Sequence, residues 1–201
     1  MKKERKVENQ DEKEPIPQPR RTFYSLIVKR CLDILLSGLA LLCLSPLLLI
    51  LCILELIFHG SPIFYKTRRP GKDRKIFNLY KFRSMTNERD SEGILLTEDK
   101  RLTKFGLFLR KTSMDELPEL FNIFKGDMSI IGPRPLLIEY LDLYTPRHAM
   151  RQSVRPGLAC VRIQLSESKT WTWREQFEND IYYIENISLS TDIRMIFAVL
   201  K

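Results

Sequence analysis

The feature that most constrains this chain is a long apolar run. The segment from Ile34 to Phe58, ILLSGLALLCLSPLLLILCILELIF, has 25 residues and a single ionisable side chain, Glu55. A helix needs roughly 20 apolar residues to cross a bilayer, so this run is long enough to enter a membrane. It does not fit a cleavable signal peptide, because it starts too far into the chain and no small-residue cleavage site follows it. The run therefore predicts a membrane-associated helical segment.

Two details of the run leave two interpretations open. Basic residues flank both ends, with Lys29 and Arg30 before it and a cluster from Lys66 to Lys75 after it, which favours both flanks on the cytoplasmic side. Ser45-Pro46 lies at the centre, where a proline removes a backbone hydrogen bond and kinks a helix. One interpretation is a re-entrant segment that bends at Ser45-Pro46 and returns to the same face. The other is an ordinary span with a tolerated proline.

Composition narrows the class of partner without selecting it. The chain has 33 Lys and Arg against 25 Asp and Glu, a formal net charge of +8. This excess favours an anionic partner such as an acidic membrane surface, a nucleic acid or a phosphorylated substrate. Its four cysteines show no C-x-x-C spacing, and it has only two histidines. A zinc or redox site, a multi-histidine metal site and a histidine-centred triad are therefore disfavoured.

A short hairpin and a loop are expected after the apolar run. Residues Ile63–Lys66 and Ile76–Phe82 are rich in residues that favour strands, and Pro70-Gly71 supplies a turn between them. The polar segment Thr86–Lys100 is expected to be a loop. Eight basic residues and one acid lie between Ser61 and Arg83, which is typical of a solvated face or of a surface that binds anionic headgroups or phosphate.

Two amphipathic helices are expected next. The first, within Arg101–Lys111, has an apolar stripe with basic residues around it, which suits an interfacial helix as well as a core one. The second is ended by Gly126. The stripes consist of Leu102, Phe105 and Leu109 in the first helix and of Leu117, Leu120, Phe121 and Phe124 in the second.

The remaining chain completes a helix-rich α+β fold. There is no regular β-α alternation, no G-x-G-x-x-G and no P-loop, so the common nucleotide cradles are absent. We expect a small membrane-associated domain with an N-terminal kinked re-entrant helix, a short β-hairpin and interfacial amphipathic helices. The expected parts are a disordered charged tail (1–22), the helix-break-helix (23–59) and a catalytic domain on the cytoplasmic face (60–201). Its later elements are short helices at Leu136–Tyr144 and Pro146–Ser153, a strand at Val161–Leu165, and helices at Trp171–Asn186 and Ile193–Leu200.

The stretch KTSMDELPEL contains two adjacent carboxylates, Asp115 and Glu116. Neighbours on a helix point roughly 100° apart, so the pair cannot flank a substrate as glycosidase carboxylates do. They can divide the labour, one attacking phosphorus while the other holds Mg²⁺. A structural interpretation competes, in which Ser113 and Glu116 form a capping box or Asp115 is the N-cap with Pro118 in the first turn.

Arginines in rigid turns favour phosphoryl chemistry. Arg134 lies between Pro133 and Pro135, and Arg155 precedes Pro156-Gly157. Prolines lower the entropic cost of presenting a guanidinium to a phosphate or a carboxylate. Arg110 lies five residues before Asp115. This set suits phosphoryl transfer better than acyl or hydride transfer.

From about Phe23 to its C-terminus, the chain resembles the bacterial sugar transferase family, the monotopic phosphoglycosyl transferases that start membrane-linked glycan assembly. The block from Arg101 to Leu137 is long and specific to that family. The matching stretches are KRCLDILLS, LSPLLL, GSPIFYKTRRPG, FNLYKFRSM, RLTKFGLFLRKTSMDELPELFNIFKGDMSIIGPRPLL and VRPG.

The resemblance implies a function and its residues. Asp115 matches the nucleophile that attacks the sugar-linked phosphate of a UDP-sugar, expels UMP and forms a covalent phosphosugar-enzyme, from which polyprenyl phosphate takes the phosphosugar. Glu116 matches the carboxylate that binds the Mg²⁺ cofactor. Ser45-Pro46 matches the break of a re-entrant helix. The phosphate-binding residues would be Lys81, Arg110 and Arg134, which match the family, together with Arg155 from its rigid turn.

The implied setting is the bacterial inner membrane, with the active site on its cytoplasmic face. The implied partners are a UDP-sugar, polyprenyl (undecaprenyl) phosphate and membrane lipids, with no nucleic acid; downstream glycosyltransferases or a homo-oligomer are further candidates. One region departs from the family. After VRPG, relatives usually continue to an Asn-Gly-Arg, whereas this chain reads LACVRIQLSESKTWTW after Gly157. The departure motivates an alternative, a non-catalytic membrane-anchored member that binds or scaffolds. A basic adaptor of the membrane surface is a third hypothesis.

Overall fold

The computed structural model describes residues 15–160 and 172–199, and its contacts divide the chain into two compact units. The first, here called the dyad unit, comprises residues 30–69 and 76–130. The second, the C-terminal unit, comprises the described parts of 1–29, 70–75 and 131–201. The predicted strand at Val161–Leu165, most of the divergent stretch after Gly157 and most of the predicted tail lie outside the described residues.

The apolar run forms two helices with a break between them. A π-helical segment, Tyr24–Val28, continues into α1 (Lys29–Cys43), and α2 (Ser45–Phe58) follows. The two halves are bent by 64° at this break, which confirms the break predicted at Ser45-Pro46. Pro46 lies in the first turn of α2, and the Ser45 hydroxyl donates to the Leu42 carbonyl at 2.7 Å. Among the described residues no single helix has the length and hydropathy of a membrane span, but this bent pair satisfies that test together.

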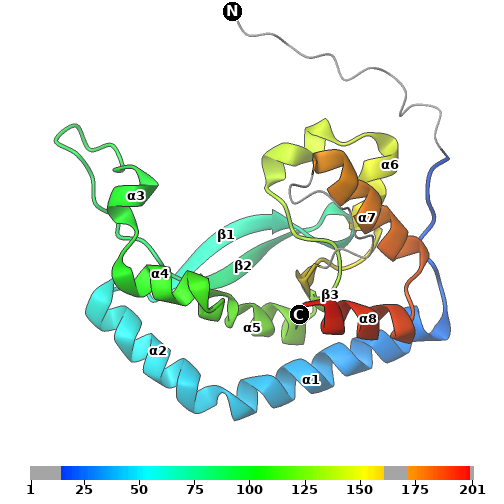
Figure 1. Cartoon of the computed structure of the whole chain (residues 1–201), viewed down its shortest axis with the longest axis horizontal. Coiled ribbons are helices and arrows are strands. Elements are labelled where there is room, and N and C mark those ends of the chain that lie inside the picture. Colours follow the sequence, from blue (N-terminus) through cyan, green and yellow to red (C-terminus); the bar gives the residue numbers. More distant parts are fainter. Residues whose placement is uncertain (1–14, 161–171, 200–201) are drawn as a thin grey trace, which may run out of the picture. The chain divides into compact units, whose positions relative to one another are not determined.

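The remainder of the dyad unit lies along one side of the bent pair (Figure 1). The predicted hairpin is present, with β1 (Phe64–Pro70) longer than expected and β2 (Ile76–Phe82) as expected. Thr103 caps α4 (Lys104–Lys111) by accepting from the Gly106 amide at 2.8 Å. The helix α5 (Glu119–Lys125) ends at Gly126 (φ 106°), as predicted. The helical elements are α3 (Glu98–Arg101), α4 (Lys104–Lys111), a 3₁₀ turn η4 (Met114–Glu116) and α5 (Glu119–Lys125).

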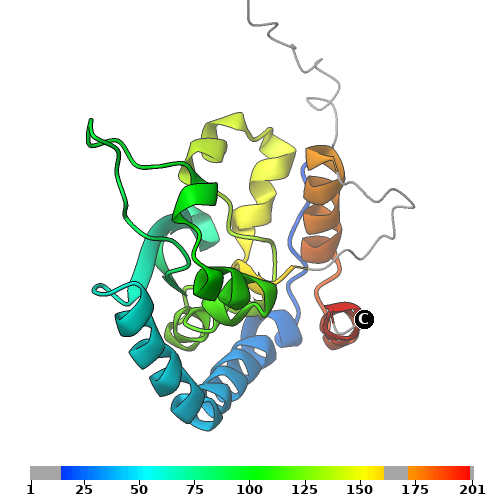
Figure 2. The same ribbon diagram turned by 60° about the vertical axis from the view of Figure 1, so that its left-hand side comes forward.

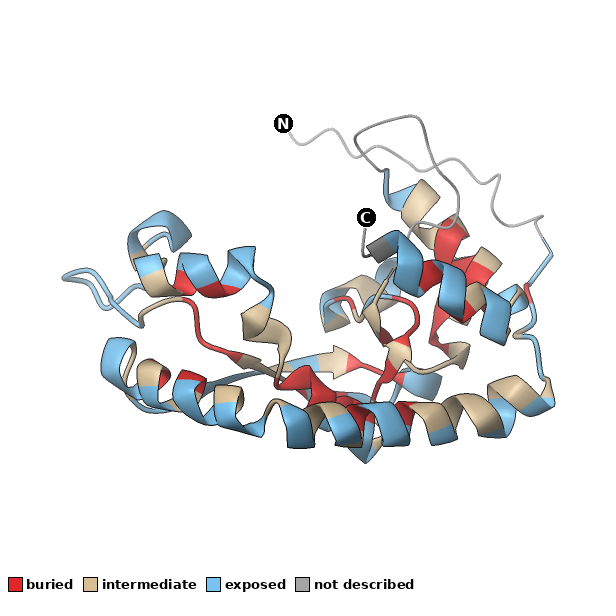
Figure 3. Cartoon of the chain, turned by 60° about the horizontal axis from the view of Figure 1, so that its bottom comes forward, coloured by how far each residue is buried: buried red, intermediate tan, exposed pale blue. Residues whose placement is uncertain are grey.

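A small apolar core holds the dyad unit together. Leu51 of α2, Phe82 of β2 and Leu109 of α4 are almost fully buried and pack together. Figure 3 shows buried and exposed residues alternating along α1 and α2. Large apolar side chains remain exposed on the outer faces of both helices, for example Leu42 at 72% and Ile57 at 69%. The bent pair thus buries one side of each helix and leaves an apolar side uncovered.

Polar residues at the start of α1 fix it to the rest of the dyad unit. The Arg30 guanidinium donates to the carbonyls of Ile123 and Phe124 at 2.7 and 2.9 Å, where it satisfies carbonyls left open at the end of α5. The buried Asp33 carboxylate accepts from the Ser129 hydroxyl and the Ile130 amide, both at 3.0 Å. The orientation of α1 is therefore set by hydrogen bonds as well as by packing.

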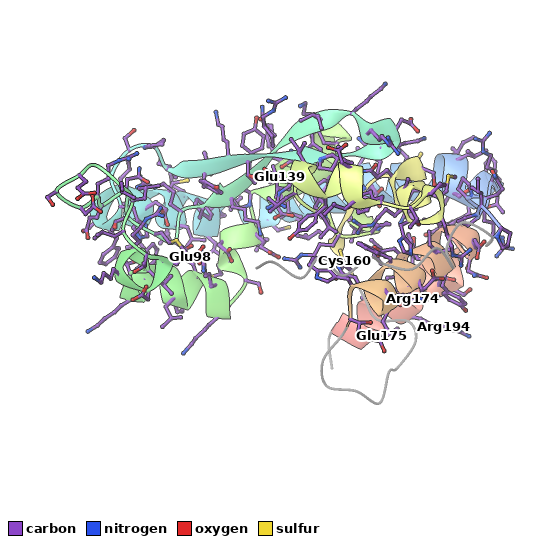
Figure 4. All side chains as sticks on the ribbon, turned by 90° about the horizontal axis from the view of Figure 1, so that it is seen from above. Glu98, Glu139, Cys160, Arg174, Glu175 and Arg194 are labelled. Carbon is purple, nitrogen blue, oxygen red and sulfur yellow. The ribbon has the colours of Figure 1, made fainter. Side chains whose placement is uncertain are left out.

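The C-terminal unit is built from short helices around α7 (Trp173–Glu185), with α8 (Leu189–Val199) turned away from its axis (Figure 2). Thr172 and Glu175 form a capping box at the start of α7, where Figure 4 labels Glu175. The helices α7 and α8 confirm the last two helices predicted from the sequence, although α8 begins at Leu189 and not at Ile193. The other elements of this unit are β4 (Gly157–Ala159), α6 (Pro146–Ala149), and 3₁₀ segments at Ile138–Leu143 and Met150–Ser153. The short strand β3 (Ser129–Ile131), which pairs with β4, begins in the dyad unit and ends in the C-terminal unit.

Asp192 joins three segments of the C-terminal unit. Its buried carboxylate accepts hydrogen bonds from the hydroxyls of Tyr24 and Tyr183, at 2.6 and 2.9 Å, and from the Lys29 ammonium at 2.6 Å. A buried carboxylate with three donors keeps the hydrogen bonds it would otherwise make to water. These contacts fix α8 against α7 and against the segment that leads into α1.

Candidate active site

The carboxylate dyad, Asp115 and Glu116, lies in the η4 turn at the edge of the apolar core. Met114 and Leu117, the residues on either side of the dyad, pack against that core. Because Met114 and Leu117 pack inward, Asp115 and Glu116 between them remain half-buried at the edge of the core. The turn that delivers them passes through Ser113, which adopts a left-handed conformation (φ 55°) that a residue with a Cβ seldom takes. Packing therefore positions the dyad on a strained turn.

Neither cap that the sequence offered is formed. Ser113 makes no side-chain cap hydrogen bond, and α5 starts only at Glu119, so Asp115 does not cap it either. Ser113 and Glu116 have the S-x-x-E spacing of a capping box, but the Glu116 carboxylate pairs with the Lys81 ammonium and not with the backbone. The structural interpretation of the dyad as a helix cap was wrong, because a charged partner distant in sequence competes with the local amide.

Lys81 of β2 is the cation nearest to the dyad. Its Nζ lies 2.6 Å from Glu116 Oε1 and 3.2 Å from Oε1 of the buried Glu119. Burial opposes the charged form of Lys81, but the carboxylates of Glu119 and Glu116 outweigh it and raise the pKa above its usual value. The ammonium is therefore held in its charged form beside the dyad, as a phosphate-binding residue requires.

The surroundings of Asp115 disfavour its ionised form. Burial raises the pKa of Asp115 above its ordinary value, and the Glu116 carboxylate raises it further. The positive charges of Lys81 and Arg110 act in the opposite direction. A half-buried carboxylate that is poorly compensated gains from meeting further positive charge or from forming a bond that removes its charge. This chemistry suits a nucleophile.

Arg110 reaches the site from the last turn of α4. Its Nε donates to the Ser84 hydroxyl at 2.8 Å, just after β2. This contact requires α4 to lie very close to the chain at Ser84, which Gly106 allows, because a Cβ there would lie 1.9 Å from the Ser84 carbonyl oxygen. The predicted residues Lys81, Arg110, Asp115 and Glu116 are thus brought together within the dyad unit.

The other two predicted arginines belong to the C-terminal unit. Their turns touch: the Gly157 amide donates to the Pro133 carbonyl at 3.0 Å, and a Cβ on Gly157 would lie 2.0 Å from the Gly132 nitrogen. The Arg134 side chain is exposed and that of Arg155 is half-buried. Beside them is a cavity of about 10 Å³, which is room for one water molecule at most. Phosphate binding by Arg134 and Arg155 stays a prediction.

Arg151 fixes the arginine-bearing turn of the C-terminal unit. Its guanidinium donates to Asp180 Oδ2 at 2.6 and 2.9 Å, to the Tyr144 hydroxyl at 2.9 Å and to the Arg134 carbonyl at 2.8 Å. The last bond holds the backbone of the Gly-Pro-Arg-Pro loop while the Arg134 side chain stays exposed. The loop is therefore attached to the rest of the unit through its backbone, and its rigidity stays a prediction from its prolines.

Glu116 has one carboxylate oxygen that a Mg²⁺ ion could use. Glu116 Oε1 pairs with Lys81, and no hydrogen bond to Oε2 is found within the described residues. Nor do those residues contain a group of three or more His, Cys, Asp or Glu side chains arranged to hold a metal. Mg²⁺ usually binds through one or two carboxylates, with substrate phosphates and water completing its shell. Glu116 fits that mode, and the predicted Mg²⁺ stays a prediction.

Two residues of the site were missed from the sequence. Glu119 follows Glu116 by three residues, which places both carboxylates on the same side of a helical segment where Lys81 meets both. Ser84, which orients Arg110, lies in the stretch FRSM, where a serine after a basic strand gave no signal of its own. The spacing of Glu116 and Glu119 was a usable signal, whereas the contact of Ser84 depends on the tertiary fold.

Comparison with known proteins gives a family match and several relatives. The model of the family "Bacterial sugar transferase" matches residues 24–201. An uncharacterized sugar transferase, EpsL, of Bacillus subtilis (strain 168) is 44% identical over 85% of this chain and 84% of its own length. A UDP-glucose:undecaprenyl-phosphate glucose-1-phosphate transferase of Klebsiella pneumoniae is 37% identical over 86% of this chain, and a UDP-N-acetylgalactosamine-undecaprenyl-phosphate N-acetylgalactosaminephosphotransferase of Aeromonas hydrophila is 34% identical over 92%. The chain spans only 39% and 45% of the lengths of the last two.

Proposed function

This chain belongs to the bacterial sugar transferase family, and on that basis we propose that it moves a sugar 1-phosphate from a UDP-sugar to polyprenyl phosphate. Membership confirms the prediction of a transferase. The names of two relatives support the donor and acceptor classes, since both are undecaprenyl-phosphate sugar-phosphate transferases that use UDP-sugars. Transfer of this kind would be the first membrane step in assembling a polysaccharide or glycoconjugate.

The observation that carries the proposal is the poorly compensated Asp115 carboxylate beside two cations. In the first step, an Asp115 carboxylate oxygen attacks the sugar-linked phosphorus, the bond from that phosphorus to the bridging oxygen breaks, and UMP leaves. Lys81 and Arg110 would bind phosphate oxygens whose negative charge is redistributed as that bond breaks. In the second step, an oxygen of polyprenyl phosphate attacks the same phosphorus and releases the Asp115 carboxylate.

Glu116 would hold Mg²⁺ through the oxygen that faces away from Lys81. When bound there, Mg²⁺ would neutralise charge on the diphosphate and on the departing UMP. The ion pair of Glu116 with Lys81 has a second consequence, since it fixes the orientation of both groups before substrate arrives. Such preorganised charges cost little rearrangement during the reaction.

The bent helix pair would place the site at the membrane surface. Its exposed apolar faces, its break at Ser45-Pro46 and its basic flanks support a re-entrant segment with both ends on the cytoplasmic side of the bacterial inner membrane. A site just outside the bilayer would receive a soluble UDP-sugar from the cytoplasm and a polyprenyl phosphate from the lipid phase.

The proposal is tested by incubating the full chain in phospholipid nanodiscs with Mg²⁺ and a panel of UDP-sugars. We expect UMP release with at least one donor, and transient labelling of the protein by a donor with ³²P in the sugar-linked phosphate. Asp115→Asn should abolish the label, and Asp142→Asn, which removes an exposed carboxylate of the C-terminal unit, should retain it. Normal turnover by Asp115→Asn would contradict the covalent mechanism. Absence of UMP release across the panel would favour the non-catalytic binding or scaffolding role.

A further inference from the structure

The dyad unit contains an apolar cavity that the proposed chemistry at the dyad does not use. Its volume is about 340 Å³, within the range of about 300–1,000 Å³ that is typical of ligand pockets. Leu41 of α1 and Leu48 and Cys52 of α2 line it, so the cavity lies against both arms of the bent helix pair. A ligand in this cavity would have direct access from the apolar surface of those helices.

Strand β2 separates this cavity from the cations of the site. Tyr80 and Phe82 line the cavity, and Lys81 between them pairs with Glu116 and Glu119. Successive side chains of a strand point to opposite faces, so Lys81 leaves β2 on the face away from the cavity. The cavity and the dyad are therefore two compartments that share one wall.

The two compartments meet at the start of α5. Pro118 lines the cavity and follows Asp115 by three residues, which on helical backbone is an advance of about 5 Å. Phe121, one turn further on, is exposed and lines the cavity as well. A chain lying in the cavity could therefore end within a few ångströms of the dyad by passing around this edge of β2.

Lys66 is the one charged residue among those that line the cavity. Its ammonium lies 5.7 Å from the centre of the Tyr80 ring, and no ion pair joins it to a carboxylate within the described residues. A cation at an otherwise apolar cavity is complementary to a ligand with an apolar chain and an anionic end. A phosphate monoester, with about −1.5 to −2 charges at pH 7, fits it better than a less charged phosphodiester.

We propose that this cavity binds the prenyl chain of the acceptor lipid next to its phosphate, and that Lys66 attracts that phosphate. The inference rests on the proposed transfer to polyprenyl phosphate and adds to it the place where the acceptor is held. It also explains the arrangement of β2, which keeps the lipid chain on one face while Lys81 and the dyad meet the sugar nucleotide on the other.

Cys52 provides a direct binding assay that needs no catalysis. In the full chain with Cys31→Ser, Cys43→Ser and Cys160→Ser, Cys52 is the remaining thiol, and its alkylation by N-ethylmaleimide can be followed by mass spectrometry in phosphatidylcholine nanodiscs. We expect undecaprenyl phosphate to slow this alkylation about tenfold. The matched control retains Cys43, which is exposed on α1 and does not line the cavity, and its alkylation should not change.

Three lipids distinguish the occupants of the cavity. Undecaprenyl phosphate should protect Cys52 at about one tenth of the concentration needed with undecaprenol, which lacks the phosphate, or with phosphatidylglycerol, an anionic lipid with two acyl chains. Lys66→Gln should remove the advantage over undecaprenol, and Arg68→Gln, an exposed cation two residues further along β1, should retain it. Equal protection by phosphatidylglycerol, or no protection at all, would overturn the proposal.

Kinetics separate this inference from the proposed function. Cys52→Trp, which fills the cavity, should raise the KM for undecaprenyl phosphate about tenfold while the KM for the UDP-sugar and the covalent label stay unchanged. An unchanged acceptor KM would overturn the inference and leave the transferase intact. Protection of Cys52 without UMP release from any donor would refute the transfer reaction and support the lipid cavity. Lys66→Gln gives the same kinetic test if Cys52→Trp does not fold.

Discussion

Two clusters of charged residues in this molecule differ in how completely their charges are compensated. In the dyad unit, the carboxylates of Asp115, Glu116 and Glu119 gather around Lys81, and the charge of Arg110 acts on Asp115 as well. In the C-terminal unit, Arg151 and Asp180 form a one-to-one buried pair at 2.6 Å. The first cluster leaves Asp115 with a raised pKa and is partly open to solvent, whereas the second is a matched and closed pair.

The hydrogen bonds of the two clusters differ in the same sense. All three nitrogens of the Arg151 guanidinium have acceptors, from Asp180, Tyr144 and the Arg134 carbonyl, and the guanidinium also lies 5.4 Å from the centre of the Phe177 ring. Such completeness favours a fixed structure. The dyad cluster leaves Asp115 with a raised pKa and an incomplete set of compensating charges, which favours reaction with an incoming phosphate. The closed Arg151–Asp180 pair is thus built for stability, and under the proposed function the poorly compensated Asp115 is available for reaction.

The strongest test of this contrast is Asp115→Asn. We expect sugar-phosphate transfer to fall by about 10⁴-fold or more, because the nucleophile is lost. Stability should not fall with it. Since the folded state raises the pKa of Asp115, ionisation of this group opposes folding above that pKa, and a neutral side chain removes this opposition. Thermal unfolding at pH 7 should therefore show an unchanged or higher midpoint, and a markedly lower midpoint would contradict the assignment of Asp115 to function.

The opposite pattern is expected for Arg151→Met. Removing one partner of a buried ion pair leaves Asp180 charged and unpaired, which costs about 3–5 kcal/mol of unfolding free energy. The double variant Arg151→Met with Asp180→Leu should recover much of that loss. Denaturant unfolding of the full chain measures both. The control is Arg147→Met, whose pair with Glu178 is more exposed and worth about 0–1 kcal/mol. Equal losses in both single variants would contradict the structural role.

Lys81→Gln should disturb the dyad cluster through its electrostatics. Without the ammonium, the pKa of Asp115 rises further, so more of it is protonated at a given pH and the acid side of the pH–rate profile moves to higher pH. We expect activity at pH 7 to fall about 10–100-fold and to recover partly as the pH is raised. Lys125→Gln, which removes an exposed ammonium paired with Asp127, should leave the profile unchanged.

The same substitution gives a stability signature at high pH. The raised pKa of Lys81 means that its ion pairs stabilise the folded state at pH values below the unfolded pKa of about 10.4, and that this contribution is lost as the pH rises through the folded value. The unfolding free energy of the wild type should therefore fall more steeply above that pH than that of Lys81→Gln. Parallel curves would show that the Lys81 pairs contribute no stability.

Local signals predicted much of the fold. The proline at the centre of the apolar run, the turn chemistry of the hairpin and the glycine after α5 each act within a few residues, and the structure contains the break, the hairpin and the helix end. The apolar stripe of α5 was less informative. Leu120 is buried, but Phe121 and Phe124 are exposed, because Phe121 lines the cavity and Phe124 faces Gly38 of α1. Periodicity identifies an apolar face and does not say which partner covers it.

The site was less accessible to sequence reasoning than the fold. The pair of Lys81 with Glu116 joins residues 35 positions apart, so only the family resemblance pointed to Lys81. The capping pattern at Ser113 gave the wrong geometry, because the energy of a tertiary ion pair exceeded that of a local cap. Arg134 and Arg155 were identified from rigid turns, and the structure describes those turns within the C-terminal unit alone. Long-range contacts and the placement of units follow from the whole fold and carry no local signal.

The smallest expected effect concerns the strained residue before the dyad. Ser113 has φ 55°, which costs a residue with a Cβ roughly 1 kcal/mol relative to glycine. Ser113→Gly relieves this strain but increases the freedom of the unfolded chain, which costs about 0.5–1 kcal/mol. The unfolding free energy should therefore change by less than about 0.5 kcal/mol.

Activity should respond more than stability, because the serine restricts the turn that orients Asp115. We expect the rate of transfer by Ser113→Gly to fall severalfold. Asp73→Gly is the matched control, since Asp73 has the same strain (φ 54°) in the turn of the hairpin and belongs to the C-terminal unit. It should show the same small change in stability with normal activity. Full activity in Ser113→Gly would mean that the strain at this turn is incidental, and the contrast between the clusters would then depend on their charges alone.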